Sequence, residues 1–159
     1  MGLKLRKQTK RKKYQLIDTV NFVMEGAAFI SENVLNKIRM MELQSIDAFV
    51  KGHGTKTDWL NLTDMLNISE LMAKAGIGPE ALDTVMKAQN ELLKSAERYK
   101  MIGKFGLTGV GIQLIRDSYE YHDLQRQSIS RGEYERFITK ARNKIQSRSR
   151  DVVYVESVK

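Results

Sequence analysis

The sequence predicts an all-α protein, a single-domain bundle of five or six helices with a disordered basic N-terminal arm and a short C-terminal tail. Apolar residues recur at helical spacing through most of the chain. The 159 residues include one proline, which leaves little of the punctuation that all-β folds need. With 42% apolar residues, a chain of this length can bury one core.

Charge divides the chain into three predicted parts. Residues 1–13 hold seven basic residues and no acidic one, a self-repelling composition that predicts a disordered arm. Residues 14–148 form the predicted helical domain, in which residues 14–130 hold 12 basic and 15 acidic residues. Residues 131–150 are again basic, with seven basic residues against two acidic ones. Residues 149–159 form the tail, whose run from Val152 to Val155 has strand propensity but no evident partner strand.

The first helices follow from their caps and stripes. Residues 17–30 fit either a short helix or a strand, and the helices elsewhere favour the helix. Ser31 is placed to cap a helix that continues to Lys51 and ends at a glycine-containing loop. Thr57 then begins a second helix, which ends at Gly76. Apolar residues cover much of its circumference, so we expect it to be the most buried helix.

The later helices are separated by strong turn signals. Glycine just past one helix and proline at the start of the next mark a tight turn at Gly76, Gly78 and Pro79. The next helix continues to about Ile102. After a glycine-rich stretch, a helix spans residues 109–126, and a predicted capping box at residues 130–133 opens the last helix.

The glycine-rich stretch, residues 103–112, admits two interpretations. Its residues precede a helix N-terminus, where free amides favour an anion, so it could cradle a phosphate. Its spacing, however, fits neither a P-loop nor a dinucleotide fingerprint. We therefore favour a tight helix–helix corner, with Gly106, Gly109 and Gly111 as its turn residues and Phe105 and Leu107 packed in the core.

Catalytic and metal chemistry have little support. The pair His122-Asp123 resembles the dipeptide of metal phosphohydrolases, but the only other histidine is His53, and it lies in a glycine loop. His122 falls on the apolar stripe of its helix, which favours a hydrogen-bonded, partly buried histidine. The chain contains no cysteine, so a thiol nucleophile and a thiolate metal site are excluded. We expect no enzyme activity, no metal and no cofactor.

Methionines are numerous in the helices. They could mark an adaptable binding groove, because methionine repacks easily against varied partners, but core filling is the favoured interpretation. The residues concerned are Met40, Met41, Met65, Met72, Met86 and Met101.

The basic ends are the strongest functional signal. In the last helix, basic residues four apart form one stripe opposite the apolar face, and such a stripe can follow phosphates. A solvated helix face and a solubilising arm are the alternative. The candidate nucleic-acid-binding residues are Lys4, Arg6, Lys7, Lys10, Arg11, Lys12, Lys13, Arg136, Lys140, Lys144 and Arg148.

Several short motifs carry a family resemblance. They are the segment from Trp59 to Leu71, the turn at residues 76–80, the glycine stretch at 106–112, Ile115-Arg116-Asp117 and His122-Asp123, together with the basic start of the chain. Across residues 4–145 the chain resembles small uncharacterised prophage-encoded proteins of Gram-negative bacteria. The resemblance implies a phage or prophage origin and a bacterial cytoplasm, and it brings no activity with it.

Two functions remain open at this point. The first is a non-enzymatic phage or prophage accessory protein that binds nucleic acid or a nucleoprotein complex through its basic arm and last helix. The second is a protein–protein interaction module, either an anti-CRISPR-like inhibitor of a host defence complex or a self-associating structural protein. No apolar run is long enough for a membrane span, so we expect a cytoplasmic location without a membrane partner.

Overall fold

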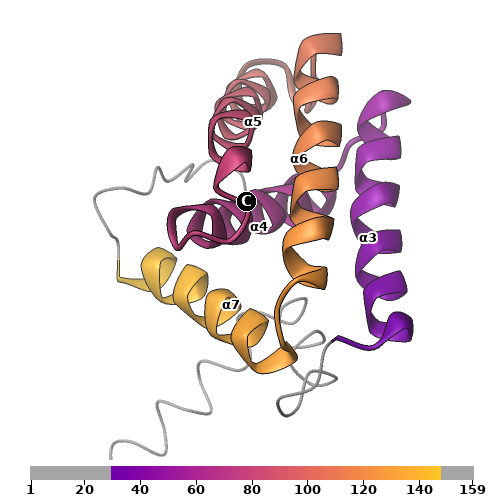
Figure 1. Cartoon of the computed structure of the whole chain (residues 1–159). Helices are drawn as coiled ribbons and strands as arrows, with labels where there is room; N and C mark the ends of the chain where they lie inside the picture. Colours follow the sequence, from indigo (N-terminus) through magenta and orange to yellow (C-terminus); the bar gives the residue numbers. More distant parts are fainter. Residues whose placement is uncertain (1–29, 148–159) are drawn as a thin grey trace, which may run out of the picture.

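The computed structural model describes residues 30–147, which form helices and connecting turns without a β-strand (Figure 1). The elements are α3 (Glu32–Val50), α4 (Lys56–Lys74), the short 3₁₀ helix η1 (Pro79–Ala81), α5 (Leu82–Ile102), α6 (Gly109–Gln127) and α7 (Arg131–Gln146). The all-α prediction is confirmed for this part of the chain. The predicted arm and tail, and the ambiguous segment 17–30 except for its last residue, lie outside the described residues.

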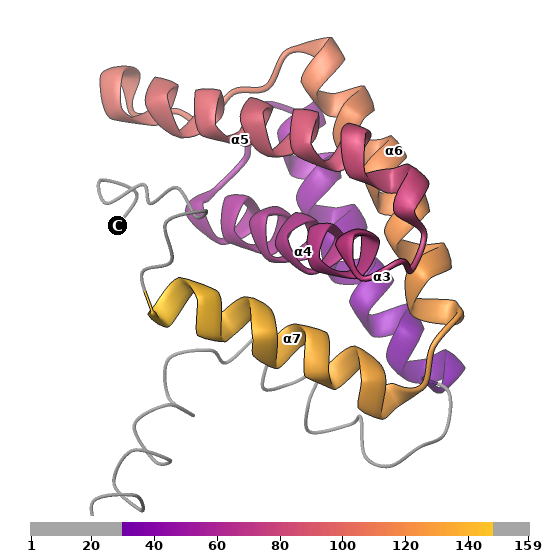
Figure 2. The ribbon, with the colours of Figure 1, turned by 60° about the vertical axis from the view of Figure 1, so that its left-hand side comes forward.

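Helix α4 lies at the centre of the described helices, and α3, α5, α6 and α7 all pack against it (Figure 2). Ten of its 19 residues are buried, more than in any other described helix, as its all-round apolar pattern predicts. Two apolar clusters meet along it. Leu62 and Leu66 belong to a cluster shared with α5 and the first half of α6, whereas Ile68 and Met72 belong to one shared with α7.

Side-chain caps fix where the helices begin. The hydroxyl of Ser31 accepts a hydrogen bond from the Val34 amide, so this predicted cap is confirmed. The prediction that Thr57 begins the next helix was wrong by one residue, because α4 begins at Lys56. Thr55 is the cap, because its hydroxyl and the Asp58 side chain bond reciprocally to each other's backbone amides.

The turn between α4 and η1 uses glycine where the backbone requires it. Gly76 and Gly78 both lie in the left-handed region, with φ of 91° and 60°, and Pro79 is the first residue of η1. A Cβ added to Gly78 would lie 2.9 Å from Cγ of Gln125, which belongs to α6. The turn therefore needs glycine at position 78 both for its conformation and for its contact with α6.

The glycine-rich stretch connects α5 to α6 and is anchored by an aromatic cluster. Phe105 is buried and stacks on Tyr99, with ring centroids 4.2 Å apart, while Trp59 and Phe49 complete its surroundings. Arg98 donates a hydrogen bond to the carbonyl of Gly106 at 2.6 Å. These contacts hold the connection against the core.

The three glycines expected to shape this corner are not equivalent. A Cβ on Gly111 would lie 3.3 Å from Oε2 of Glu91, so α5 and α6 approach closely there. Gly106 has only an ordinary contact, with Arg98. Gly109 has an ordinary backbone conformation, and no described atom would lie within 4 Å of its Cβ. The structure gives no reason for glycine at position 109.

The methionines are only partly core residues. Met65 and Met72 are buried as expected. Met40, Met86 and Met101 are large exposed side chains, with Met101 84% exposed at the end of α5, so core filling was the wrong interpretation for these three. Met40 lies two residues from both Ile38 and Glu42, which places it opposite the buried face of α3.

Candidate nucleic-acid interface

Helix α7 is attached to the other described helices through one side. Tyr134, Ile138 and Ala141 are buried at spacings of four and three residues, which places them on a single face. They join the cluster formed by the second half of α4 and the first half of α3. The helix forms one edge of the described assembly and runs alongside α4 (Figure 2).

The opposite face of α7 is polar and basic. Arg136 and Lys140, both predicted site residues, are exposed and lie one helical turn apart, and Lys144 continues the row as a half-buried residue. Thr139 and Asn143 are exposed beside them. The structure thus places the described part of the predicted basic stripe on one surface.

The remaining predicted binding residues lie outside the described residues. They are the seven basic residues of the N-terminal segment, Lys4, Arg6, Lys7, Lys10, Arg11, Lys12 and Lys13, together with Arg148. Whether the N-terminal segment and α7 act on one ligand stays a prediction.

Two exposed cations of α7, Arg136 and Lys140, lie in a stretch that holds no acid, residues 136–147. Four surface lysines on α4 and α5 or directly after α3 each contact a carboxylate three or four residues earlier, namely Lys51, Lys74, Lys87 and Lys94. On α7 the acidic residues are confined to Glu133 and Glu135 in the first turns. Lys140 has no carboxylate three or four residues away in either direction, so its charge has no neutralising partner on its own helix.

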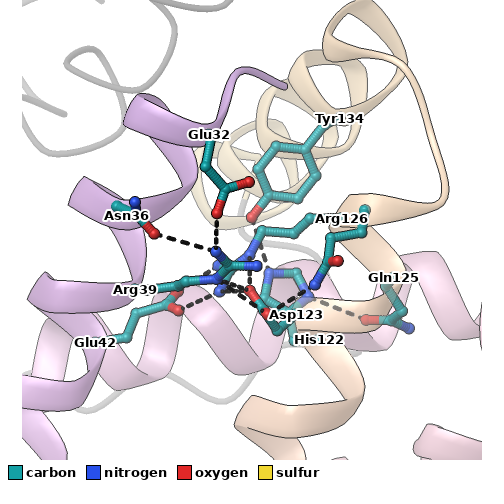
Figure 3. A network of polar contacts seen from close by, with 10 residues as sticks. Glu32, Asn36, Arg39, Glu42, His122, Asp123, Gln125, Arg126 and Tyr134 are labelled. Atoms are coloured by element: carbon teal, nitrogen blue, oxygen red, sulfur yellow. Dashed lines mark hydrogen bonds and ion pairs between the residues drawn. The ribbon is translucent and has the colours of Figure 1, made fainter. Parts of the chain in front are cut away.

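A buried hydrogen-bonded chain fixes α7 to α6 (Figure 3). His122 is fully buried, and its Nε2 lies 2.8 Å from the Tyr134 hydroxyl, while its Nδ1 lies 3.0 Å from Oε1 of Gln125. Because Oε1 can only accept, Nδ1 carries the proton and Nε2 accepts from Tyr134. The first turn of α7 is therefore held by a directional bond as well as by apolar packing.

Gln125 extends these hydrogen bonds from α6 to α4. Its Oε1 also accepts from the Ser69 hydroxyl at 2.7 Å, and its Nε2 donates to the carbonyl oxygens of Ser69 and Ile77. One amide thus links α6 to α4 and to the turn that contains Gly78. This explains why that turn approaches Gln125 so closely.

An ion-pair network joins α6 to α3 in the same region (Figure 3). Arg126 is fully buried and donates two hydrogen bonds to the Glu42 carboxylate, at 2.8 and 2.9 Å, and two more to Oδ1 of Asp123. Asp123 also accepts from Arg39 at 3.0 Å, and Arg39 in turn contacts Glu32. The paired fork of Arg126 suits a carboxylate geometrically, so the buried charges are compensated.

Burial sets the protonation states of the network. Burial, reinforced by the charge of Arg126, lowers the pKa of His122 to about 3, so its imidazole is neutral at pH 7. Burial raises the pKa of Tyr134 to about 12. Burial also disfavours the charged form of Asp123, but hydrogen bonds from Arg39 and Arg126 outweigh it, and the pKa of Asp123 lies below its usual value.

These contacts oppose a metal or catalytic role for His122-Asp123. Both ring nitrogens of His122 are engaged, and the carboxylate of Asp123 accepts from Arg39, Arg126 and Gln127. Within residues 30–147, no group of three or more histidine, aspartate or glutamate side chains could hold a metal ion. The expectation of a buried, hydrogen-bonded histidine is confirmed, and its burial is complete rather than partial.

Sequence reasoning missed the buried ion pair. Glu42 lies four residues from both Ile38 and Ile46, and Arg126 lies four residues after His122. Each charged residue therefore lies on the apolar face of its helix, at a position where a buried side chain is expected. Two opposite charges interrupting the stripes of two helices were the available signal.

Comparisons with protein-family models, curated proteins and solved structures found no match for this chain. The prophage resemblance therefore stays a prediction. No helix in the described part of the chain is long and apolar enough to cross a membrane.

Proposed function

We propose that this protein binds nucleic acid, alone or within a nucleoprotein complex, through the exposed basic face of α7 together with the basic N-terminal segment. The supporting observation is the exposure of Arg136 and Lys140 on the face of α7 opposite its buried one, in a stretch, residues 136–147, that contains no acid. Phosphates of a nucleic acid would supply a counter-charge to these two exposed cations. The proposed origin remains phage or prophage, and the proposed role is non-enzymatic.

A rigid attachment supports this role. The buried side of α7 is packed on α4 and its first turn is bonded to His122, so the basic residues keep their spacing without a ligand. Lys140 lies about 6 Å further along the helix axis than Arg136 and on the same side of the helix. Pre-organised cations lose less entropy on binding than cations on a flexible loop.

The test measures binding of the full chain to a labelled 20-base-pair duplex and to a single strand by fluorescence anisotropy. Charge reversal at Arg136 and Lys140 should weaken binding about tenfold or more at low salt. The matched control reverses Lys51 and Lys87, which changes the net charge equally at exposed positions on other helices. Equal losses in the two variants, or no binding by the parent chain, would contradict the proposal.

A protein–protein interaction module is the second candidate, and exposed apolar side chains at the end of α5 favour it. Met101 and Ile102 are 84% and 68% exposed there. Exposed apolar residues clustered at one point are typical of contact sites. Capture of a partner from a bacterial lysate that survives nuclease and high salt, and that is lost on Met101→Ser with Ile102→Ser, would favour this role. A partner released by nuclease would instead support nucleic-acid binding.

A further inference from the structure

We infer that α7 enters the major groove of duplex DNA and that its exposed face contacts base edges as well as phosphates. This inference rests on the proposed function and specifies its ligand. The observation that carries it is the combination of a rigid, edge-mounted helix with side chains that can read bases.

The chemistry of the exposed face is broader than a row of cations. Arg136, Thr139, Lys140 and Asn143 are all exposed, and their spacings of three, one and three residues place them on one side of the helix. Arginine pairs with guanine in two hydrogen bonds, asparagine pairs with adenine in the same way, and threonine contacts the thymine methyl group. Phosphate binding alone would need only the two cations.

The connection between α6 and α7 is a short, well-fixed turn. It consists of Ser128, Ile129 and Ser130, and α7 turns sharply away from the direction of α6 (Figure 1). Ser128 donates to the carbonyl of Gln125 at 2.7 Å, Ser130 accepts from the Glu133 amide, and Ile129 is buried. Two helices joined by a three-residue turn are typical of helix-turn-helix proteins, in which the second helix enters the major groove.

Helix α7 also has suitable dimensions. Its 16 residues extend over about 24 Å, and a helix with its side chains is about 10–12 Å wide. The major groove of B-form DNA is about 12 Å wide and admits one helix. Because α7 lies at the edge of the described helices and packs on them through one face, its long axis can follow the groove.

Duplex DNA fits this surface better than RNA or a single strand does. The major groove of an A-form RNA duplex is deep and narrow, so a helix cannot enter it. Proteins that bind single strands stack the bases on aromatic side chains. The two aromatic residues of α7 are the buried Tyr134 and the partly buried Phe137, which packs against the apolar cluster, so neither offers such a platform.

The experiment compares the full chain on four ligands of matched length and sequence: duplex DNA, duplex RNA, single-stranded DNA and single-stranded RNA. We expect duplex DNA to be bound about tenfold or more tightly than duplex RNA. Methyl green, which occupies the major groove, should displace the protein, whereas netropsin in the minor groove should not. Equal affinity for all four ligands would overturn the inference and leave the proposed function standing, whereas no binding to any of them would overturn both.

Asn143→Ala and Thr139→Ala separate base contacts from charge, because neither changes the net charge. A duplex sequence is first selected from a random pool with the parent chain. Each variant should then bind the selected duplex about tenfold more weakly, a loss within the range of one base contact, while its affinity for a scrambled duplex is unchanged. Failure of the parent to enrich any sequence, or equal losses on both duplexes, would overturn the inference. Circular dichroism and thermal melting check that the variants remain folded.

Discussion

Replacing Arg126 with methionine is the sharpest test of how the described helices hold together. Arg126 is fully buried and Glu42 nearly so, and two hydrogen bonds of 2.8 and 2.9 Å join them. The substitution would leave the Glu42 carboxylate buried without its partner, and such a loss costs about 3–5 kcal/mol. Asp123 would keep its contacts with Arg39 and Gln127, so the penalty falls mainly on Glu42.

The assay is urea unfolding followed by circular dichroism. Because a small domain is stable by only about 5–15 kcal/mol, a loss of this size is visible as a large shift of the midpoint. Glu42→Met combined with Arg126→Met should recover at least half of the loss, since an apolar pair of similar volume often replaces a buried ion pair without penalty. Lys51→Met is the control, because its pair with Asp47 is exposed and screened by solvent, so the midpoint should barely move.

Two outcomes would refute this reasoning. A loss below about 1 kcal/mol for Arg126→Met would show that Glu42 finds water or another donor, contrary to the observed burial. A double variant no more stable than the single one would show that the pair itself, and not the uncompensated charge, supplies the stability.

Three further predictions concern stability. The unfolded chain takes up a proton on His122 near pH 6.5, whereas the folded chain does so only near pH 3, so stability falls as the pH falls between these values. His122→Gln should remove this pH dependence in urea titrations. Burial raises the pKa of Asp64, a residue of α4, to about 7, with Arg142 opposing the shift, so stability should fall as the pH rises from about 4 to 7. Asp64→Asn should abolish this fall and stabilise the protein by about 1–2 kcal/mol at pH 8. An unchanged pH profile would argue against the raised pKa. Gly78→Ala should cost about 1–3 kcal/mol by thermal melting, because of its positive φ and its contact with Gln125, whereas Gly109→Ala should change stability by less than about 0.5 kcal/mol.

Much of the helical structure could be predicted because local signals agree with each other. The turn at Gly76, Gly78 and Pro79 combines the preferences of one helix end and the next helix start, and the structure places the ends there. The error at Thr57 has a local cause, because Thr55 and Thr57 are both acceptable caps. Only the reciprocal bond between Thr55 and Asp58 distinguishes them.

Pairings between distant segments could not be predicted in the same way. Glu42 and Arg126 are 84 residues apart, and neither reveals its partner through its own helix. The exposed methionines were mispredicted because the core-filling interpretation was based on residue type and not on the position of each residue around its helix. The basic face of α7 could be predicted because it depends on one helix alone.

The dependence of affinity on salt tests the central proposal most directly. Each phosphate contact contributes about 0.9 to the slope of log affinity against log salt concentration for a duplex. For the full chain we predict a steep negative slope, and reversal of Arg136 and Lys140 should make it shallower by about 2. A slope near zero, or one unchanged by these substitutions, would contradict nucleic-acid binding through α7.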